Sequence, residues 1–286
     1  MTQKLSGKDY ASELKTKLAT LGKEWYREDR YVAILFFWDN IGSQVYTRLK
    51  KKFGNDISLD VRIIGQEKEY TAEEILVLID GLNADMKCIG IIVQLPLPEY
   101  LESDKGRILT HIDHTKDIDG LWGEAFGKSL VLEKGFMPAT PAAVVGLMDY
   151  HGLGNVKGKI VAVLGQSHLV GWPLATILMQ RGASVISCNE HANQQTIKSM
   201  TKKADIIISC TGVVHLVDNT YVSDDKSQVL VDVGYGKKNG KAAGDVNPEA
   251  VTDFVKAYTP VPGGVWPATI AHLFTNIKIL QDIRAV

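Results

Sequence analysis

The stretch Tyr31-Val-Ala-Ile-Leu-Phe-Phe37, followed after a short turn by Gly42-Ser-Gln-Val-Tyr-Thr-Arg-Leu-Lys50, decides the fold of this chain. The first run is apolar throughout, which predicts a buried strand. Ser43 is suited to cap a helix that runs to about Phe53. An uninterrupted apolar strand that leads through a turn into a helix is typical of an α/β fold.

Tyr46 and Lys50 share one face of this helix, because residues four apart on a helix are neighbours. A phenol and an ammonium held together at the carboxyl end of a strand can polarise a substrate and move a proton. Pairs at this spacing are common on helices, and most are a solvated lysine beside a half-buried tyrosine. The spacing alone therefore does not decide between a catalytic pair and an ordinary helix surface.

The first half of the chain continues this alternation of strands and helices. Strands are predicted at 58–64 and 88–93, and helices at 8–28 and 71–83. The second of these helices opens with the capping box Thr71-Ala-Glu-Glu74. The order of apolar strands and helices predicts a parallel sheet covered by helices.

Two polar motifs are expected at the carboxyl edge of this sheet, where ligands of open parallel sheets bind. Gln94-Leu-Pro-Leu-Pro98 follows a predicted strand, and prolines cannot continue a central strand, so the chain leaves the sheet there. Lys116-Asp-Ile-Asp-Gly120 places two carboxylates around one isoleucine. A fixed carboxylate can accept a bidentate hydrogen bond from an amidine-like heterocycle, and an Asx turn explains the same motif structurally.

The second half restarts the α/β pattern after a boundary at 138–141. A helix to about Tyr150 is expected to bridge two domains, and strands are predicted at 159–164, 183–188, 204–210 and 229–234. Four buried strands, most of them ending in glycine, predict a doubly wound nucleotide-type domain. The first strand of this half runs into Gly165-x-Ser167-x-x-x-Gly171, which places backbone N–H groups and a helix N-terminus where a diphosphate can sit. This spacing is a weaker dinucleotide signal than Gly-x-Gly-x-x-Gly.

The end of the second strand of that domain is expected to meet the adenosine ribose of a dinucleotide. Glu190 stands there, and an acid at that place can bind a free 2′-hydroxyl and repels a 2′-phosphate. An exposed loop glutamate without a ligand fits the position equally well. Further on, Pro260–Pro267 predicts a rigid turn, with Pro267 starting a final helix whose apolar stripe packs onto the first domain.

Composition bounds the class of protein. The 286 residues are 45% hydrophobic with a net charge of −1, which predicts one or two domains with a large core and gives no sign of nucleic-acid binding. No apolar run is long enough for a membrane span, and no metal-ligand cluster is found. Three dispersed cysteines (Cys88, Cys188 and Cys210) are expected to be buried free thiols, so a soluble cytoplasmic protein is expected.

Seven motifs, taken in order, resemble a known family. They are Ser43-x-x-Tyr46-x-x-x-Lys50, Gln94–Pro98, Lys116–Gly120, Pro138-x-Thr-Pro141, Gly165-x-Ser-x-x-Val-Gly171-x-Pro173, Gly244-Asp-Val246 and Thr259–Gly264. Each is weak alone, but together they resemble the bifunctional methylenetetrahydrofolate dehydrogenase/methenyltetrahydrofolate cyclohydrolase (FolD) family over nearly the whole chain.

The resemblance implies two reactions. A nicotinamide oxidises 5,10-methylenetetrahydrofolate to the methenyl cation, and water then opens this cation to 10-formyltetrahydrofolate. Lys50 matches the family's catalytic lysine, Gln94 the glutamine that holds it, Tyr46 the tyrosine that stacks on folate, and Asp119 the carboxylate that grips the pterin. Further substrate contacts match Ser43, Pro262, Gly263 and Gly264. Cofactor contacts match Gly165, Gln166, Ser167, Val170, Gly171, Glu190, His191, Thr211, Gly212 and Tyr235.

The resemblance also implies two domains. Residues 1–140 and 267–286 are expected to form a three-layer α/β catalytic and folate-binding domain, with the C-terminal helix packing back onto it. Residues 141–266 are expected to form a Rossmann-like dinucleotide-binding domain. A homodimer through the second domain and tetrahydrofolate derivatives as partners are expected.

The chain departs from the family at several positions, and three alternatives stay open. Leu121-Trp-Gly123, Ala139, Trp266 and Ala268 differ from common family residues and leave the pocket shape open. The family default is NADP, whereas Gln166 and Glu190 locally favour NAD, with only His168 and His191 to supply positive charge. The alternatives are a dehydrogenase alone, a non-catalytic nucleotide- or folate-binding module, and an unrelated hydroxy- or amino-acid dehydrogenase.

Overall fold

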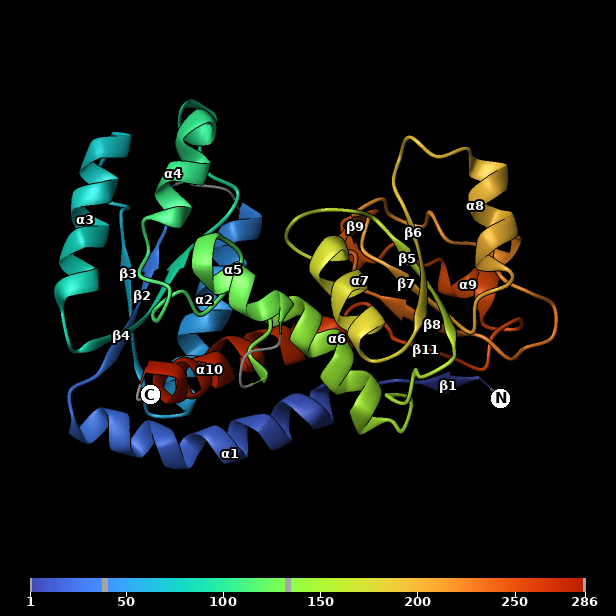
Figure 1. Cartoon of the computed structure of the whole chain (residues 1–286), viewed down its shortest axis with the longest axis horizontal. Helices are drawn as coiled ribbons and strands as arrows, with labels where there is room; N and C mark the ends of the chain where they lie inside the picture. The colour runs from blue at the N-terminus through green and yellow to red at the C-terminus, as the bar shows by residue number, and fades with distance from the viewer. Residues whose placement is uncertain (1, 38–40, 132–134, 285–286) are drawn as a thin grey trace. The chain divides into compact units, whose positions relative to one another are not determined.

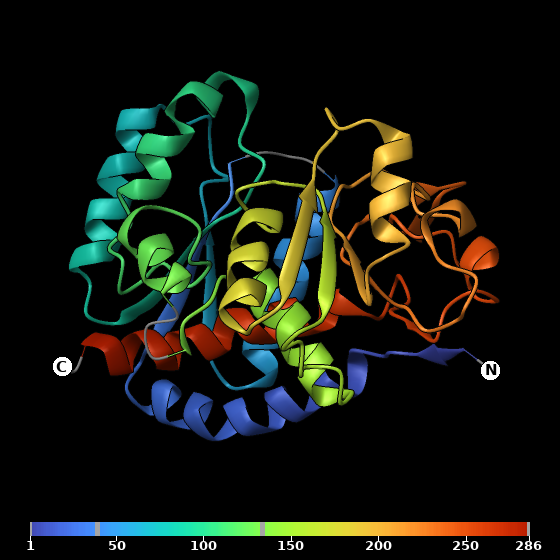
Figure 2. The ribbon, with the colours of Figure 1, turned by 45° about the vertical axis from the view of Figure 1, so that its right-hand side comes forward.

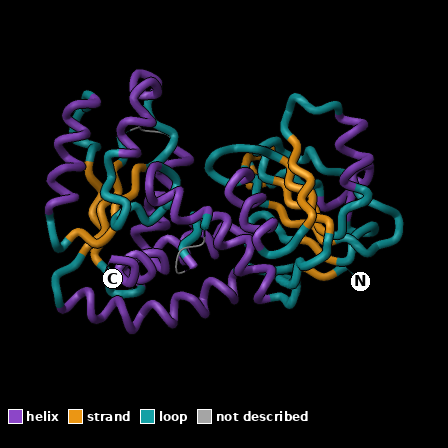
Figure 3. Tube along the Cα trace, viewed as in Figure 1, coloured by secondary structure: helices purple, strands orange, loops and turns teal. Residues whose placement is uncertain are grey.

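The computed structural model describes residues 2–37, 41–131 and 135–284 and divides into two compact units. The three-stranded unit comprises Ser12–Ala139 and Ile270–Val286, and the six-stranded unit comprises Met1–Ala11 and Thr140–Thr269. In each unit the strands are flanked by helices (Figures 1 and 3). None of the described helices is long and apolar enough to cross a membrane.

The three-stranded unit is built on a parallel sheet of order β3-β2-β4. Its strands are β2 (Tyr31–Leu35), β3 (Asp60–Ile64) and β4 (Cys88–Val93). The helices are α1 (Lys8–Arg27, from Ser12 onward in this unit), α2 (Ile41–Asp56), α3 (Ala72–Ala84), α4 (Lys105–Thr110), α5 (Gly123–Leu130) and α10 (Val265–Arg284, from Ile270 onward in this unit). A short 3-10 helix, Glu99–Asp104, precedes α4.

Side chains of β2 alternate between two cores, as the period of a strand requires. Val32 and Ile34 join a core with α1 and α10, and Ala33 and Leu35 join a second core with α3 and α4. Helices therefore cover both faces of the sheet, which is why all five residues of β2 are buried. The predicted three-layer α/β architecture is confirmed, including the C-terminal helix packed onto it.

The helix starts show where local signals suffice. The predicted capping box is present: the Glu74 backbone N–H donates to Thr71 Oγ1 over 3.3 Å, and the Thr71 N–H donates to Glu74 Oε2 over 2.9 Å. The prediction that Ser43 caps α2 was wrong, because α2 begins at Ile41 and the Ser43 hydroxyl donates to the Leu95 carbonyl over 3.5 Å instead. The final helix begins at Val265, before the predicted start at Pro267.

The six-stranded unit carries a wholly parallel sheet of order β1-β11-β8-β7-β5-β6. Its strands are β1 (Gln3–Lys4), β5 (Ile160–Leu164), β6 (Ser184–Cys188), β7 (Ile206–Ser209), β8 (Val229–Asp232) and β11 (Ala257–Tyr258). Its helices are α6 (Ala139–Tyr150, from Thr140 onward), α7 (Gly171–Gln180), α8 (Gln194–Thr201) and α9 (Pro248–Val251). Figure 2 shows β5 and β6 side by side. The strand order is that of a doubly wound fold, as predicted.

Two features of this unit were not predicted. Residues 1–11 belong to it rather than to the first domain, because β1 pairs with β11 and the Leu5 N–H donates to the Tyr258 carbonyl over 2.8 Å. An antiparallel hairpin, β9 (Gly236–Lys238) with β10 (Lys241–Ala243), follows β8. The first is a correction to the expected boundary. Its cause is the pairing of Gln3 with Ala257 and of Lys4 with Tyr258, which no local pattern in the sequence reveals.

We expect the core between the sheet and α10 to dominate the stability of the three-stranded unit. Phe274 is fully buried and stacks on Phe53 with ring centroids 5.2 Å apart. Phe274→Ala should lower the free energy of unfolding by about 3–5 kcal/mol in urea titrations, since it removes buried area and leaves a cavity. Tyr26→Ala, at a side chain that is 71% exposed, is the control and should change it by less than about 0.5 kcal/mol. Equal effects of the two variants would contradict this assignment.

Candidate active site and dinucleotide pocket

Lys50 and Gln94 meet at the carboxyl edge of the three-stranded sheet. Lys50 lies on α2 and its Nζ donates to Gln94 Oε1 over 3.0 Å. Gln94 follows β4 directly, and its backbone N–H donates to the Leu35 carbonyl at the end of β2 over 2.8 Å. The sequence placed these residues at one edge, and the structure brings their side chains into contact.

The orientation of the Gln94 amide is fixed by its second hydrogen bond. Gln94 Nε2 donates to the Leu95 carbonyl over 2.8 Å, so Oε1 is the atom left to face Lys50. Only 9% of Gln94 is exposed, and the Leu95–Pro96 peptide that follows it is cis. The Gln-Leu-Pro motif thus presents an amide oxygen in a set position to the lysine.

Charge and burial oppose each other in this site. Burial lowers the pKa of Lys50, and the Asp119 carboxylate partly offsets this by raising it. Burial likewise raises the pKa of Asp119, and the Lys50 ammonium counteracts that rise. Each group therefore stabilises the charged form of the other in a place where water does so poorly.

The loop that carries Asp119 runs alongside β4. Asp117 forms a parallel bridge with Ile91, and the Ile91 N–H donates to the Lys116 carbonyl over 2.7 Å. Asn276 of α10 fixes the same loop, because its Nδ2 donates to the carbonyl oxygens of Ile118 and Met137, each over 2.9 Å. Asp119 therefore stands on a loop held from two sides.

Lys116 and Asp117, in the same motif, serve the loop itself. Lys116 is buried and its Nζ donates to three carbonyl oxygens at the end of α3, those of Leu82, Asn83 and Asp85, over 2.7–2.8 Å. The Gly120 N–H donates to Asp117 Oδ1 over 3.0 Å, so the Asp117 carboxylate holds the turn from Asp117 to Gly120. The role of Lys116 was missed, because its partners lie more than 30 residues away.

Tyr46 is half-buried on α2, one turn before Lys50. Thr47, which follows Tyr46 in sequence, is only 2% exposed. The face of the helix that carries Ser43, Thr47 and Lys50 is thus turned inward, with Tyr46 beside it. This arrangement excludes the interpretation of Lys50 as a fully solvated surface lysine.

In the six-stranded unit, the glycine turn after β5 is tight. Gly165 has a φ of +105°, and a Cβ at Gly171 would lie 1.9 Å from the Gly165 carbonyl oxygen. Only glycine fits at position 171, because any side chain there would collide with the backbone of Gly165. The Val170 and Trp172 N–H groups both donate to the Ser167 carbonyl, so the turn closes onto the start of α7. The turn therefore brings the backbone at Gly165 against the backbone at Gly171, at the start of α7.

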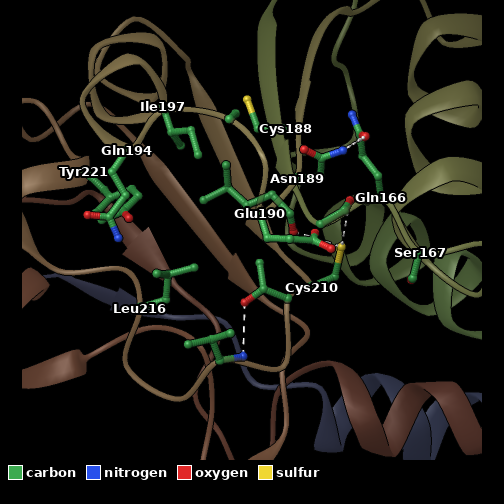
Figure 4. Close-up of a pocket in the computed structure, with 15 residues that line it drawn as sticks. Gln166, Ser167, Cys188, Asn189, Glu190, Gln194, Ile197, Cys210, Leu216 and Tyr221 are labelled. Atoms are coloured by element: carbon green, nitrogen blue, oxygen red, sulfur yellow. Dashed lines mark hydrogen bonds between the residues drawn. The ribbon is translucent and has the colours of Figure 1, made fainter.

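A cavity of about 620 Å³ opens at the ends of β5, β6 and β7. Figure 4 shows residues of its wall, with Asn189 Nδ2 donating to Gln166 Oε1 over 2.9 Å. Gln166 Nε2 in turn donates to Ser187 Oγ over 3.1 Å, which fixes the amide over the edge of β6. Of the lining residues that the structure describes, Glu190 alone carries a charge.

The residues expected to contact a cofactor divide into those that line this cavity and those that do not. Gly165, Gln166, Ser167, Glu190 and Thr211 line it. Val170, Gly171, Gly212, His191 and Tyr235 are outside its lining, and Tyr235 packs edge-on against Trp266 with ring centroids 6.0 Å apart. At the Pro262–Gly264 turn, the Gly7 N–H donates to the Gly263 carbonyl over 2.9 Å, so the N-terminal segment packs against this turn.

Two domain models of one family match the two halves of this chain, with bounds that differ from those of the two structural units. A model described as tetrahydrofolate dehydrogenase/cyclohydrolase, catalytic domain, matches residues 5–119, and the NAD(P)-binding domain of the same family matches residues 138–284. This chain belongs to the tetrahydrofolate dehydrogenase/cyclohydrolase family. Membership makes it a bifunctional enzyme of one-carbon folate metabolism that uses a nicotinamide dinucleotide.

Individual members of the tetrahydrofolate dehydrogenase/cyclohydrolase family match over almost their full length. The bifunctional protein FolD of Aquifex aeolicus is 35% identical over 270 residues, which is 94% of this chain and 90% of that protein. The crystal structure of the Campylobacter jejuni enzyme FolD gives a TM-score of 0.91 at 33% identity, covering 99% of this chain and 100% of that one. The Trypanosoma brucei FolD structure, a complex with NADP cofactor and inhibitor, gives 0.90 at 26% identity, covering 99% and 98%.

The buried carboxyl of Asp117 predicts a distinct pH dependence of stability. Burial, with the nearby charge of Asp119, raises the pKa of Asp117 to about 7, so the ionised form is disfavoured in the folded protein. Stability from this group is therefore present at low pH and lost as pH rises from about 4 to about 7. Asp117→Asn retains an oxygen for the Gly120 N–H and does not ionise. Its thermal midpoint should fall less than that of the wild type between pH 5 and pH 8, by on the order of 2–4 °C.

The matched control for this measurement is Glu99→Gln, at an exposed carboxylate of the same unit. It should follow the wild-type profile across the pH range. A profile of Asp117→Asn that parallels the wild type would show that Asp117 is ionised throughout.

Proposed function

We propose that Lys50 moves the proton in the cyclohydrolase reaction. The observation that carries this is the hydrogen bond from Lys50 Nζ to the fixed Gln94 oxygen, beside a carboxylate at Asp119. Burial lowers the pKa of Lys50, which makes the neutral amine more available near neutral pH than it is for a lysine in water. A group with its pKa close to the working pH is the most effective general acid or base.

In this proposal, water adds to the methenyl carbon and gives up a proton to the neutral Lys50 amine. The hydroxyl group of this adduct then loses its proton to solvent as the bond between the carbon and N5 breaks, and the Lys50 ammonium returns its proton to N5. The carbon remains on N10 as a formyl group, and the net reaction releases one proton. Gln94 positions the amine, since its oxygen accepts from Nζ whether the lysine is charged or neutral. Asp119 supports the ammonium that forms after the first proton transfer.

Asp119 and Tyr46 are the residues that we propose for binding the folate. A carboxylate next to a lysine can accept paired hydrogen bonds from the edge of the pterin, which presents an amidine-like group. The half-buried ring of Tyr46 offers a face for stacking. Ser43 and the Pro262–Gly264 turn are further proposed contacts. The three-stranded unit is accordingly proposed as the folate-binding and catalytic domain.

The cavity in the six-stranded unit is the proposed dinucleotide site. The glycine turn fits a diphosphate, since Gly165 and Gly171 carry no Cβ and the turn leads into the start of α7. The cofactor supplies the acceptor for the hydride of the methylene carbon. Positioning is the main requirement of that step, because the folate nitrogens stabilise the methenyl cation. A homodimer formed through this unit remains a prediction.

We propose that the dinucleotide is NAD in preference to NADP. Glu190 is the charged residue of the described lining, and its carboxylate suits a ribose 2′-hydroxyl and opposes a 2′-phosphate. The Gln166 amide is held by Ser187 and Asn189, two uncharged partners, where a positive charge would favour a phosphate. His191 is 83% exposed and forms a loose pair with Glu190 at 3.8 Å.

Lys50→Met tests the proposed proton transfer. We expect methenyl hydrolysis to fall by about 100-fold or more, since general acid–base groups contribute on the order of 10²–10⁴. Dehydrogenase activity should remain within a few-fold of the wild type, because hydride transfer does not use the amine. Lys51→Met, at the exposed neighbour on α2, is the matched control and should leave both activities unchanged. Unchanged hydrolysis in Lys50→Met would exclude Lys50 as the proton carrier.

The cofactor preference is tested by kcat/KM for NAD and NADP with methylenetetrahydrofolate. The wild type should prefer NAD, and Glu190→Gln should reduce this preference by removing the charge alone. Gln166→Arg combined with Glu190→Ser should shift the ratio toward NADP by at least about tenfold, which corresponds to 1.4 kcal/mol. A wild-type preference for NADP would refute the proposed role of Glu190.

A further inference from the structure

Two buried carboxylates lie behind the proposed dinucleotide pocket, and the mechanism above uses neither. Asp232 ends β8 and is 2% exposed, and Asp245 follows β10 and is fully buried. Each lies within two residues of a glycine in sequence: Asp232-Val-Gly234 and Gly244-Asp245-Val246. Ionisable groups are seldom buried unless they hold specific partners, so the partners of these two indicate their purpose.

Asp245 holds the segment that follows β7. Its Oδ2 accepts four hydrogen bonds, from Ser209 Oγ (2.8 Å), Thr211 N (2.7 Å), Thr211 Oγ1 (2.9 Å) and Gly212 N (3.3 Å). Cys210 and Thr211 of this segment line the dinucleotide cavity (Figure 4). One carboxylate oxygen therefore fixes the backbone and two side-chain hydroxyls of residues 209–212, a segment that forms part of the cavity wall.

Asp232 in turn holds the segment that carries Asp245. Its Oδ1 accepts from the Gly234 and Asp245 N–H groups, each over 3.0 Å, and its Oδ2 accepts from the Val246 N–H over 2.9 Å. Burial, reinforced by the nearby charge of Asp245 and opposed by these N–H groups, raises the pKa of Asp232 to about 7. The two carboxylates thus link β8, residues 244–246 and the cavity wall through a continuous chain of hydrogen bonds.

The two glycines show that this packing is reciprocal. A Cβ at Gly234 would lie 1.8 Å from Asp245 Oδ1, and a Cβ at Gly244 would lie 2.0 Å from Asp232 Oδ2. Each carboxylate therefore occupies the space that a side chain on the other segment would need. This close fit explains why both segments carry glycine, although neither glycine has a positive φ.

We propose that Asp245 is a positioning residue for dinucleotide binding, which acts by holding residues 209–212 in the shape that the cofactor requires, with Asp232 holding Asp245. This inference rests on the proposed function of the cavity as the dinucleotide site. The N–H groups of Thr211 and Gly212 are directed to Asp245, so these residues serve the ligand through the surface they form rather than through those donors.

The two carboxylates differ in a way that gives a sharp test. Asp245 uses Oδ2 for all four donors, and its Oδ1 makes no hydrogen bond to any residue of the described chain. In Asp245→Asn the amide oxygen can replace Oδ2, and the amide nitrogen takes the place of the unused oxygen. Asp232 uses both oxygens, so Asp232→Asn must turn an amide donor toward backbone N–H groups. The same chemical change is therefore tolerated at one site and not at the other.

The experiment measures the Kd of the dinucleotide by fluorescence titration and steady-state KM and kcat of the full chain. Asp245→Ala and Asp232→Asn should each raise the Kd and KM of the cofactor by about tenfold or more, with kcat at saturating cofactor within about threefold. Asp245→Asn should stay within about threefold of the wild type in all three. Ser209→Ala, which removes one donor and leaves the cavity lining untouched, should give a smaller rise of about two- to fivefold.

Asp225→Asn is the matched control, since this exposed carboxylate holds a turn formed by Ser223 and Ser227. It should leave cofactor binding unchanged.

If Asp245→Ala fails to fold, the graded effects of Ser209→Ala and Asp245→Asn carry the test. Wild-type affinity in Ser209→Ala together with lost affinity in Asp245→Asn would overturn the proposal. A lower melting temperature with unchanged KM in Asp245→Ala would also overturn it, because the role would then be structural only. A wild type that binds neither NAD nor NADP would instead refute the proposed function of the cavity, and this inference with it.

Discussion

Parallel strand pairing is the constraint on which both sites depend. In a parallel sheet every strand ends at the same edge, so side chains that follow different strands meet there although they are far apart in sequence. In the three-stranded unit this brings Gln94, after β4, to Lys50 on the helix that follows β2. In the six-stranded unit it brings the glycine turn after β5, the loop after β6 and the segment after β7 to one cavity. In each unit, the parallel direction of the strands brings the candidate functional side chains to the same edge of the sheet.

Burial then determines what the assembled groups can do. The Lys50 ammonium and the Asp119 carboxylate lose water at the sheet edge, and each partly replaces water for the other. A lysine in such a place gives up its proton more readily than one in solution. In the proposed reaction the Gln94 amide keeps Nζ in place, because an oxygen acceptor suits both protonation states of the lysine. The position of Lys50 Nζ is thus set by Gln94, whereas its proton affinity is set by burial and by Asp119.

The sequence predicted those parts of the fold that local chemistry determines. The Thr71 capping box, the apolar strands and the glycine turn depend on residues close in sequence, and all are found. Ser43 was wrongly given a capping role, because its hydroxyl has a partner in Leu95, 52 residues away. The N-terminal residues were placed in the wrong domain for the same reason, since the pairing of β1 with β11 has no local signal.

In the candidate site, too, the sequence predicted the local motifs but not the contacts between residues far apart in the chain. Lys50, Gln94 and Asp119 could be found as motifs, and their meeting could be expected from the sheet. The three carbonyl partners of Lys116 and the two of Asn276 could not, because only the fold brings them together. The Gly244-Asp-Val246 motif is visible in the sequence, but the role that we propose for Asp245 follows from hydrogen bonds that only the fold creates.

Both units use the same device to hold a loop at the sheet edge. In one, the Asp117 carboxylate accepts from the Gly120 N–H, and in the other, the carboxylates of Asp232 and Asp245 accept from backbone donors that follow β7, β8 and β10. A carboxylate can bind several N–H groups at once, and burial makes each of these bonds costly to break. Beyond the sheet edge the loops no longer form the backbone hydrogen bonds that order the strands. The buried carboxylates accept hydrogen bonds from the loop N–H groups in their place. Burial raises the pKa of Asp117 and of Asp232, and both carboxylates order loops that carry the proposed binding surfaces.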